Sequence, residues 1–318
     1  GGIWKSVDAG LTYVPLTDQL PQIGVSGIAI DPNNSSIIYI ATGDDDAGDS
    51  YSVGIWKSTN AGLSWQQTGL DPSNSPYRTS EIYISSNDSN TLWVATSDGV
   101  YKTTNAGLSW TLSQSGNFRD LKIKPSDPNT IYATTSSEFY ISTNAGDSFT
   151  QISSGLPTDS GRLFMDVTEA NSDYIYIVSA TDNYEYQGIY RSTNSGQSFT
   201  QMDNTTDIFE SPQAWYDLAI AASNTNANEI YVGVLNIWKS VDGGDSFTQV
   251  NSWTTRNDSY THADIHFIRD LENGLYVGSD GGVFKSTDGG SLFTDLTVGM
   301  GITQFYRISV SKQNSNKI

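Results

Sequence analysis

The chain has no cysteine among its 318 residues, and it has only two histidines and three methionines. The absence of cysteine excludes a disulfide framework, a zinc site built on thiolates and a cysteine nucleophile. The fold must therefore be stabilised by packing and hydrogen bonding, without covalent cross-links.

Basic residues are also few, with 16 Lys and Arg against 35 Asp and Glu and a net charge of −19. Such a field repels nucleic acid and anionic membranes, and it disfavours a strongly anionic substrate such as polysialic acid. Cations, neutral glycans and basic peptides stay open as ligands. No run approaches the roughly 18 apolar residues of a transmembrane helix, so we expect no direct membrane insertion.

Tyrosine (18) and tryptophan (8) are abundant, which is typical of half-buried β-strands. The many Asn, Ser, Thr, Gly and Asp residues, with little Lys, resemble the composition of bacterial surface and secreted proteins. This composition predicts a bacterial protein located outside the cell or on its surface.

One octapeptide recurs seven times, with the pattern S-x-[D/N]-x-G-x-[S/T]-aromatic, and residues 58–65 (S-T-N-A-G-L-S-W) are a clear copy. The Asp or Asn is expected to accept hydrogen bonds from nearby backbone N–H groups, and the Gly allows the positive φ of a tight bend. No copy stands out chemically, so we interpret the motif as a structural fastener. Its acidic or amide positions are Asp8, Asn60, Asn105, Asn144, Asn194, Asp242 and Asp288.

The spacing of these motifs, from 39 to 52 residues, is typical of a propeller or solenoid array. Each repeat also contains four short strand-like segments separated by Gly, Asn and Pro turns, which predicts a four-stranded antiparallel blade. We therefore expect an all-β propeller with seven blades, forming a single domain over 1–318 within a longer chain. The predicted blades are about 25–68, 81–113, 118–152, 162–202, 214–250, 263–296, and 304–318 joined to 2–16.

The motif resembles the Asp-box, also called the BNR repeat, and the blades are similar to sortilin/VPS10-like and xyloglucanase-like propellers. They also resemble large secreted Bacteroidetes proteins with a C-terminal sorting domain. This resemblance implies the fold more strongly than an activity. The chain lacks the cysteine-rich module of sortilin-type receptors, and it holds one propeller where xyloglucanases use two, each giving a catalytic carboxylate.

The loops that join the second and third strands share one face with the connections between blades, and the long loops all lie on that face. There, Asp44, Asp45, Asp46 and Asp49 form a cluster of carboxylates that suits Ca²⁺, although a solvated acidic loop is the favoured interpretation. His262, Asp264 and His266 alternate along an expected strand and are a candidate metal set. The alternative is that these three side chains hydrogen-bond neighbouring blades.

An acidic ring is predicted at the mouth of the central channel, where Glu81, Asp120, Asp217 and Asp264 are expected at one equivalent position, with Arg307 there in the closing blade. The ring suits a cation or a glycan hydroxyl, but each carboxylate could instead cap backbone N–H groups of the next blade. The other candidate binding residues around it are Arg162, Trp215, Tyr216, Tyr260 and His262.

These features favour a non-catalytic propeller that binds a glycan, a peptide or another protein on the long-loop face. The alternative is a glycoside hydrolase for a neutral polysaccharide, which needs two carboxylates about 5–10 Å apart. Asp120, Asp217 and Asp264 are the candidate catalytic carboxylates for that activity. Ca²⁺ is the only cofactor that the sequence suggests.

Overall fold

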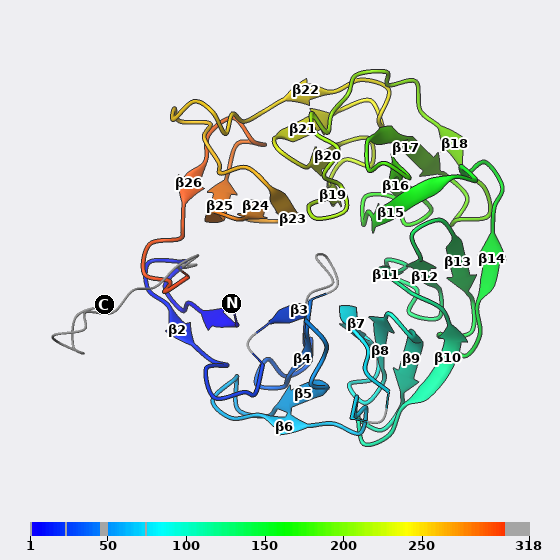
Figure 1. Cartoon of the computed structure of the whole chain (residues 1–318), viewed down its shortest axis with the longest axis vertical. Helices are drawn as coiled ribbons and strands as arrows, with labels where there is room; N and C mark the ends of the chain where they lie inside the picture. The colour runs from blue at the N-terminus through cyan, green and yellow to red at the C-terminus, as the bar shows by residue number, and fades with distance from the viewer. Residues whose placement is uncertain (1, 23, 45–49, 74, 303–318) are drawn as a thin grey trace, which may run out of the picture.

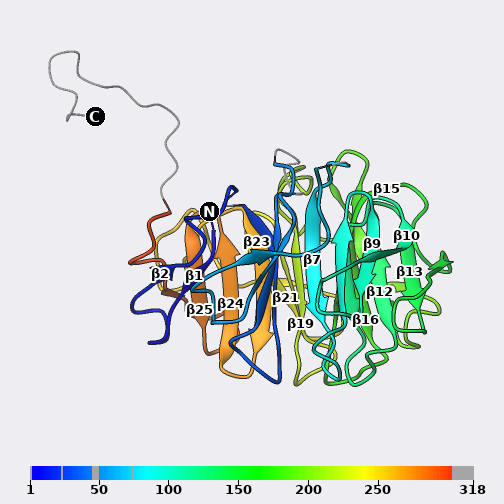
Figure 2. The same cartoon turned by 90° about the horizontal axis from the view of Figure 1, so that it is seen from below.

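The computed structural model is a ring of small antiparallel sheets around a central channel (Figure 1). It describes residues 2–22, 24–44, 50–73 and 75–302. Six of the sheets have four strands in consecutive order, with the first strand at the channel and the fourth at the outer rim (Figure 1). Figure 2 shows the ring from the side, with the strands running between its two faces. The prediction of an all-β propeller with four-stranded blades is therefore confirmed. Within the described ranges, no helix is long and apolar enough to cross a bilayer.

The strands follow the four segments of each repeat. The first strands are β3 (Val25–Ile30), β7 (Thr79–Ile84), β11 (Asp120–Ile123), β15 (Ser160–Val167), β19 (Ala219–Ala222) and β23 (Ile265–Leu271). The second strands are β4 (Ile38–Thr42), β8 (Leu92–Thr96), β12 (Ile131–Thr134), β16 (Ile175–Thr181), β20 (Ile230–Gly233) and β24 (Gly274–Ser279).

The outer half of each blade has a regular third strand and a short fourth strand. The third strands are β5 (Ile55–Ser58), β9 (Gly99–Thr103), β13 (Phe139–Ser142), β17 (Tyr186–Ser192), β21 (Ile237–Ser240) and β25 (Gly282–Ser286). The fourth strands are β6 (Gln66–Gln67), β10 (Thr111–Ser115), β14 (Thr150–Ile152), β18 (Thr200–Gln201), β22 (Thr248–Gln249) and β26 (Thr294–Asp295).

The second strands are the most apolar because both of their faces are covered by neighbouring blades. Every residue of β4 and of β8 is buried, and such strands read as continuous apolar runs. Their aromatic side chains also reach the motif turn of the next blade. The hydroxyl of Tyr39 donates to the carbonyl of Ala106 (3.2 Å), and the indole N–H of Trp93 donates to the carbonyl of Ala145 (2.8 Å). The motif turns thus connect each blade to its neighbour.

Within the motif of residues 58–65, the hydrogen bonds follow from the residue types. The Ser58 hydroxyl accepts from the backbone N–H of Gly62 (2.9 Å) and donates to Oδ1 of Asn60 (3.0 Å). The same Oδ1 accepts from the backbone N–H of Ser64 (2.9 Å). Gly62 has φ of 90°, in the left-handed region that glycine adopts at little cost. Each copy is thus a self-contained turn whose polar groups are satisfied locally.

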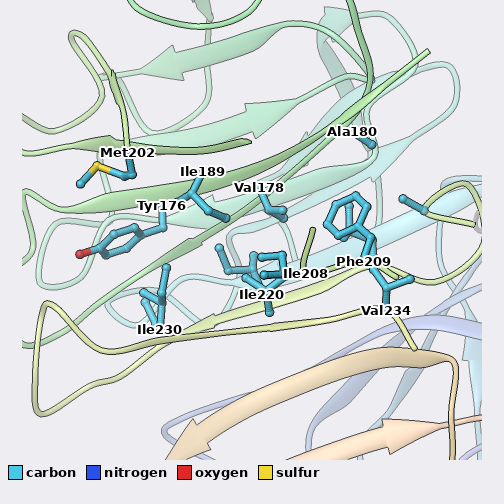
Figure 3. Packing of buried hydrophobic residues seen from close by; sticks show 14 residues of the cluster. Tyr176, Val178, Ala180, Ile189, Met202, Ile208, Phe209, Ile220, Ile230 and Val234 are labelled. Atoms are coloured by element: carbon cyan, nitrogen blue, oxygen red, sulfur yellow. The ribbon is translucent and has the colours of Figure 1, made fainter. Parts of the chain in front are cut away.

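The hydrophobic core lies between blades and extends into one blade connection. Between the fourth and fifth blades, Tyr176 and Ile189 pack with Ile220, and Ile208 and Phe209 complete the cluster (Figure 3). Ile208 and Phe209 are fully buried although they belong to the connection between the blades. Burial of such a side chain contributes about 1.5–3 kcal/mol. The chain that leads into the fifth blade is therefore anchored, not loose.

The prediction of seven blades is not met in the part of the chain that the structure describes, which has six complete blades. The remaining sheet is a hairpin of two short strands, β1 (Trp4–Lys5) and β2 (Val14–Pro15), with Trp4 paired to Pro15. These strands correspond to the third and fourth strands of a blade. The inner strands expected from 304–318 lie outside the described residues.

Candidate functional site

The central channel holds a cavity of about 600 Å³, and its lining includes Gly43 and Asp44 from a long loop. All six inner strands contribute to its wall, and four of the 16 basic residues of the chain line it. The acidic and basic side chains of the lining are Asp44, Glu81, Arg119, Lys122, Arg162, Asp166, His266 and Arg269.

Lys122 lies at the centre of a buried ion network in the channel wall. Its ammonium lies 2.5 Å from Oδ1 of Asp120 and 3.4 Å from Oε1 of Glu81. Burial alone would lower the pKa of Lys122, but the two carboxylates raise it well above its ordinary value. Lys122 therefore stays charged and holds Asp120 and Glu81 in place.

Asp120 is part of the scaffold. It has no exposed surface, and its two oxygens accept from the backbone N–H groups of Leu121 and of Met165, both at 2.8 Å. Met165 belongs to the next blade. Asp120 therefore caps a backbone N–H group of the next blade, which is one of the two roles expected for it from the sequence. Asp166 repeats the arrangement one blade further on, where it accepts from the backbone N–H of Ala222 (2.8 Å).

The four predicted acidic positions do not form one ring. Glu81 and Asp120 occupy equivalent places on the inner strands, where they pair with Ala95 and Thr134 on the second strands. Asp217 and Asp264 precede β19 and β23 and so lie nearer the mouth of the channel. The positions in those two blades that match Glu81 are Ala219 and Phe267. Arg307 lies outside the described residues.

Asp217 and Asp264 are instead joined to each other through Gln213. The amide nitrogen of Gln213 donates to Oδ2 of Asp217 (2.9 Å) and to Oδ1 of Asp264 (2.7 Å). A tight turn makes this possible, since the backbone N–H groups of Tyr216 and Asp217 both donate to the carbonyl of Gln213. Asp264 has φ of 62°, a left-handed conformation, directly before β23 begins.

Asp217 is the most perturbed acid at the mouth. Its side chain is fully buried, and its Oδ1 has no hydrogen-bond partner among the described residues. Burial raises the pKa of Asp217 to about 7; the hydrogen bond from Gln213 opposes this rise and the nearby carboxylate of Asp264 adds to it. Asp217 therefore changes charge near neutral pH.

Beside this pair, Tyr216 and His266 converge on a third carboxylate, that of Asp280. The Tyr216 hydroxyl donates to Oδ1 of Asp280 (3.0 Å), and Nε2 of His266 lies 2.9 Å from the same oxygen. The Tyr216 and His266 rings meet edge to face at 4.7 Å. Trp215 continues the aromatic surface, with its ring 5.5 Å from that of Tyr216 and 45% of the residue exposed.

We call these seven residues the mouth cluster. It consists of Gln213, Trp215, Tyr216, Asp217, Asp264, His266 and Asp280.

The metal set predicted from the two histidines is not assembled. β23 begins at Ile265, so His262 is not on the strand that was expected to align it with His266. His262 is exposed, packs against Gly281 and has Nδ1 3.0 Å from the carbonyl of Ala263. Over the described ranges, no three His, Asp or Glu side chains are grouped to hold a metal.

Three of the other predicted residues have structural contacts. Arg162 is buried, donates to the carbonyl of Ala214 (2.9 Å) and lies over the Phe164 ring. Tyr260 packs edge to face on Phe284, 6.2 Å away. In the predicted calcium loop, Asp44 forms a bridge with Ser50. The remaining calcium candidates, Asp45, Asp46 and Asp49, lie outside the described residues, so that site stays a prediction.

Sequence reasoning missed Gln213 and Asp280. Gln213 follows the Ser211-Pro212 pair that ends a connection, and nothing in its surroundings suggests that its amide joins two acids. Asp280 precedes two glycines and reads as an ordinary turn residue. A signal was available for Asp280, because its turn shares the long-loop face with Tyr216.

Known proteins match this chain through their structures. No family model and no curated protein matches it. A GH74 enzyme from Niastella koreensis has a TM-score of 0.68 at 21% identity, covering 91% of this chain and 49% of its own. The GH74 xyloglucanase from Xanthomonas campestris has a TM-score of 0.66 at 14% identity, covering 92% of this chain and 49% of its own.

YCF48 bound to D1 peptide is similar over a larger share of its own length. Its TM-score is 0.58 at 18% identity, and it covers 88% of this chain and 83% of its own. This chain thus spans about half the length of the GH74 enzymes and most of YCF48. At these identities, the similarities establish the propeller fold.

Proposed function

We propose that the chain is a non-catalytic, extracellular or cell-surface propeller that binds its ligand on the long-loop face, at the mouth of the channel. A single propeller domain over 1–318, with 304–318 completing the blade of β1 and β2, belongs to this proposal. YCF48 supports the proposal as a propeller of similar extent that is bound to a peptide.

The observation that carries the proposal is the distribution of exposed apolar side chains. Among the described residues, the large exposed aromatics all lie on the long-loop face or in the channel: Tyr51, Trp215, Trp253 and Phe267. The large hydrophobic side chains that the motif turns expose on the opposite face are all aliphatic: Val7, Leu11, Leu63, Leu108, Val241 and Leu292. Aromatic side chains that stay exposed on long loops over a rigid scaffold are typical of binding sites.

The candidate catalytic carboxylates support a non-catalytic role. Asp120 and Asp217 have no exposed surface, and Asp120 is fully engaged by Lys122 and two backbone N–H groups. A carboxyl that transfers a proton to a glycosidic oxygen must approach that oxygen within hydrogen-bond distance. Neither side chain reaches the cavity in this arrangement.

Binding to a panel of immobilised oligosaccharides and peptides tests the proposal, with Trp215→Ala as the site variant. Leu108→Ala is a matched control, since Leu108 is 81% exposed on a motif turn of the opposite face. We expect at least one ligand whose binding is lost in the Trp215 variant and kept in the Leu108 variant. Absence of binding across the panel would overturn the proposal.

A glycoside hydrolase is the second candidate, and one observation favours it. The pKa of about 7 at Asp217 is that of a general acid at neutral pH, and Asp264 is close by as a second carboxylate. The GH74 neighbours share the fold. The test is release of reducing ends from xyloglucan and other neutral polysaccharides. Hydrolysis by the wild type that is abolished in Asp217→Asn and in Asp264→Asn would establish this activity and exclude the non-catalytic role.

A further inference from the structure

We propose that the mouth cluster binds the cationic side chain of a basic peptide, a lysine ammonium or an arginine guanidinium, on the Trp215 ring and beside Asp280. The proposal rests on the binding function above and names the class of its ligand.

The aromatic half of the cluster presents a π surface that is fixed in position. Trp215 is 45% exposed, and its ring is tilted by 41° against that of Tyr216. Tyr216 is held in turn by Asp280 through its hydroxyl and by the edge-to-face contact with His266. A cation within about 6 Å of such a ring centroid is attracted by the ring quadrupole, most strongly by tryptophan.

The polar half of the cluster is acidic. Asp280 has 38% of its side chain exposed, so its carboxylate is accessible from the mouth. Behind it, Asp264 and Asp217 share the single amide of Gln213, and Oδ1 of Asp217 is buried without a partner. Because Asp217 has no exposed surface, it does not touch the cation, and when ionised it adds to the negative potential around Asp264 and Asp280.

The basic groups near the cluster are already engaged. His266 lies 2.9 Å from Asp280, and the Arg162 guanidinium donates to the carbonyl of Ala214. An ammonium or guanidinium from outside therefore adds positive charge where the carboxylates of Asp264 and Asp280 meet one imidazole. The net charge of −19 also attracts cationic partners from a distance, which accelerates their association at low salt.

Other ligand classes fit this surface less well. An acidic peptide meets Asp264 and Asp280 as like charges. A neutral glycan can stack on Trp215, but it gains nothing from the net acidic charge of the cluster. The combination of an exposed tryptophan with carboxylates is what an aromatic site for cations requires.

The experiment uses the full chain and three matched peptides: one rich in lysine, the same peptide with its lysines acetylated, and one with glutamate in their place. A xyloglucan oligosaccharide serves as a neutral probe. Affinities are measured by calorimetry for the wild type, Trp215→Ala, Asp280→Asn and the Leu108→Ala control, at about 0.02 M and about 0.5 M salt, where screening lengths differ several-fold. Thermal melts establish that each variant is folded.

We expect the lysine peptide to bind, and acetylation to weaken it at least about tenfold, since a charge contact and a cation–π contact are lost together. Trp215→Ala should weaken binding by about three- to thirtyfold, and high salt should weaken it further. Leu108→Ala should bind as the wild type does.

Equal affinity for the lysine and acetyl-lysine peptides would overturn the inference. Binding of the oligosaccharide alone, lost in Trp215→Ala, would also overturn it but would leave the proposed binding function standing. If none of the probes binds and the wider panel of glycans and peptides stays empty, the binding function itself falls.

Discussion

Replacing Asp120 with alanine should destabilise the propeller strongly, because Asp120 connects two blades and neutralises a buried cation. The Asp120 carboxylate is fully buried, and the Lys122 side chain is only 11% exposed. Loss of one member of a buried ion pair leaves the other charge without compensation and typically costs about 3–5 kcal/mol. The backbone N–H of Met165 would lose its acceptor as well.

A second carboxylate can partly replace that of Asp120, which favours a loss near the lower end of this range. Glu81 lies 3.4 Å from the Lys122 ammonium and can move closer to it. The double variant Asp120→Ala/Lys122→Met removes the cation that Asp120 neutralises and leaves Glu81 with Arg269 as its nearby cation, so it should recover part of the loss.

The assay is urea unfolding followed by tryptophan fluorescence, for which the chain has eight reporters. We expect a lower free energy of unfolding in the single variant and a clear recovery in the double variant. A loss under about 1 kcal/mol in Asp120→Ala would refute the structural role of Asp120, and so would a double variant less stable than the single one.

Three further results are expected. The folded-state pKa of Asp217 is raised to about 7, so the folded wild type holds a proton that the unfolded chain has already lost. As the pH rises from about 4 to about 7, the free energy of unfolding of the wild type should therefore fall by up to about 4 kcal/mol relative to that of Asp217→Asn. A pH-independent difference between the two proteins in urea unfolding would contradict this. Asn60→Ala should lower the free energy of unfolding by about 0.5–2 kcal/mol because the backbone N–H of Ser64 loses its acceptor. Asn60→Asp keeps that acceptor and serves as the control. Equal melting temperatures for the two variants would show that the turn does not depend on this hydrogen bond. Gly155→Ala should lower the free energy of unfolding by at least about 1 kcal/mol, because Gly155 has φ of +79° and a Cβ there would lie 1.8 Å from the carbonyl oxygen of Phe199. An unchanged melting curve would argue against this geometry.

The fold could be predicted because the repeat imposes it seven times. Each motif, such as that at 58–65, carries its own turn chemistry, and each second strand carries a run of apolar residues that must be covered on both faces. Local hydrogen bonding and packing therefore predict the same four-stranded structure in every blade. The count of blades was harder, because it depended on pairing between distant chain ends.

The site could be predicted only in part, because it is built from the segments in which the blades differ. Trp215, Tyr216, Asp217 and Asp264 were expected near the channel mouth, and they do lie together there. Their alignment with Glu81 failed since the turn at 213–217 and the left-handed Asp264 place two carboxylates before their strands. Such contacts follow from tertiary geometry, which residue spacing does not encode.

The placement of ligand binding on the mouth cluster is tested most directly by hydrogen–deuterium exchange of the full chain, free and saturated with the lysine-rich peptide. The account predicts slower exchange on binding at 213–217, 264–267 and 279–282, with the motif turns, including 58–65, unchanged. Protection confined to the motif turns, or spread evenly over both faces, would contradict it.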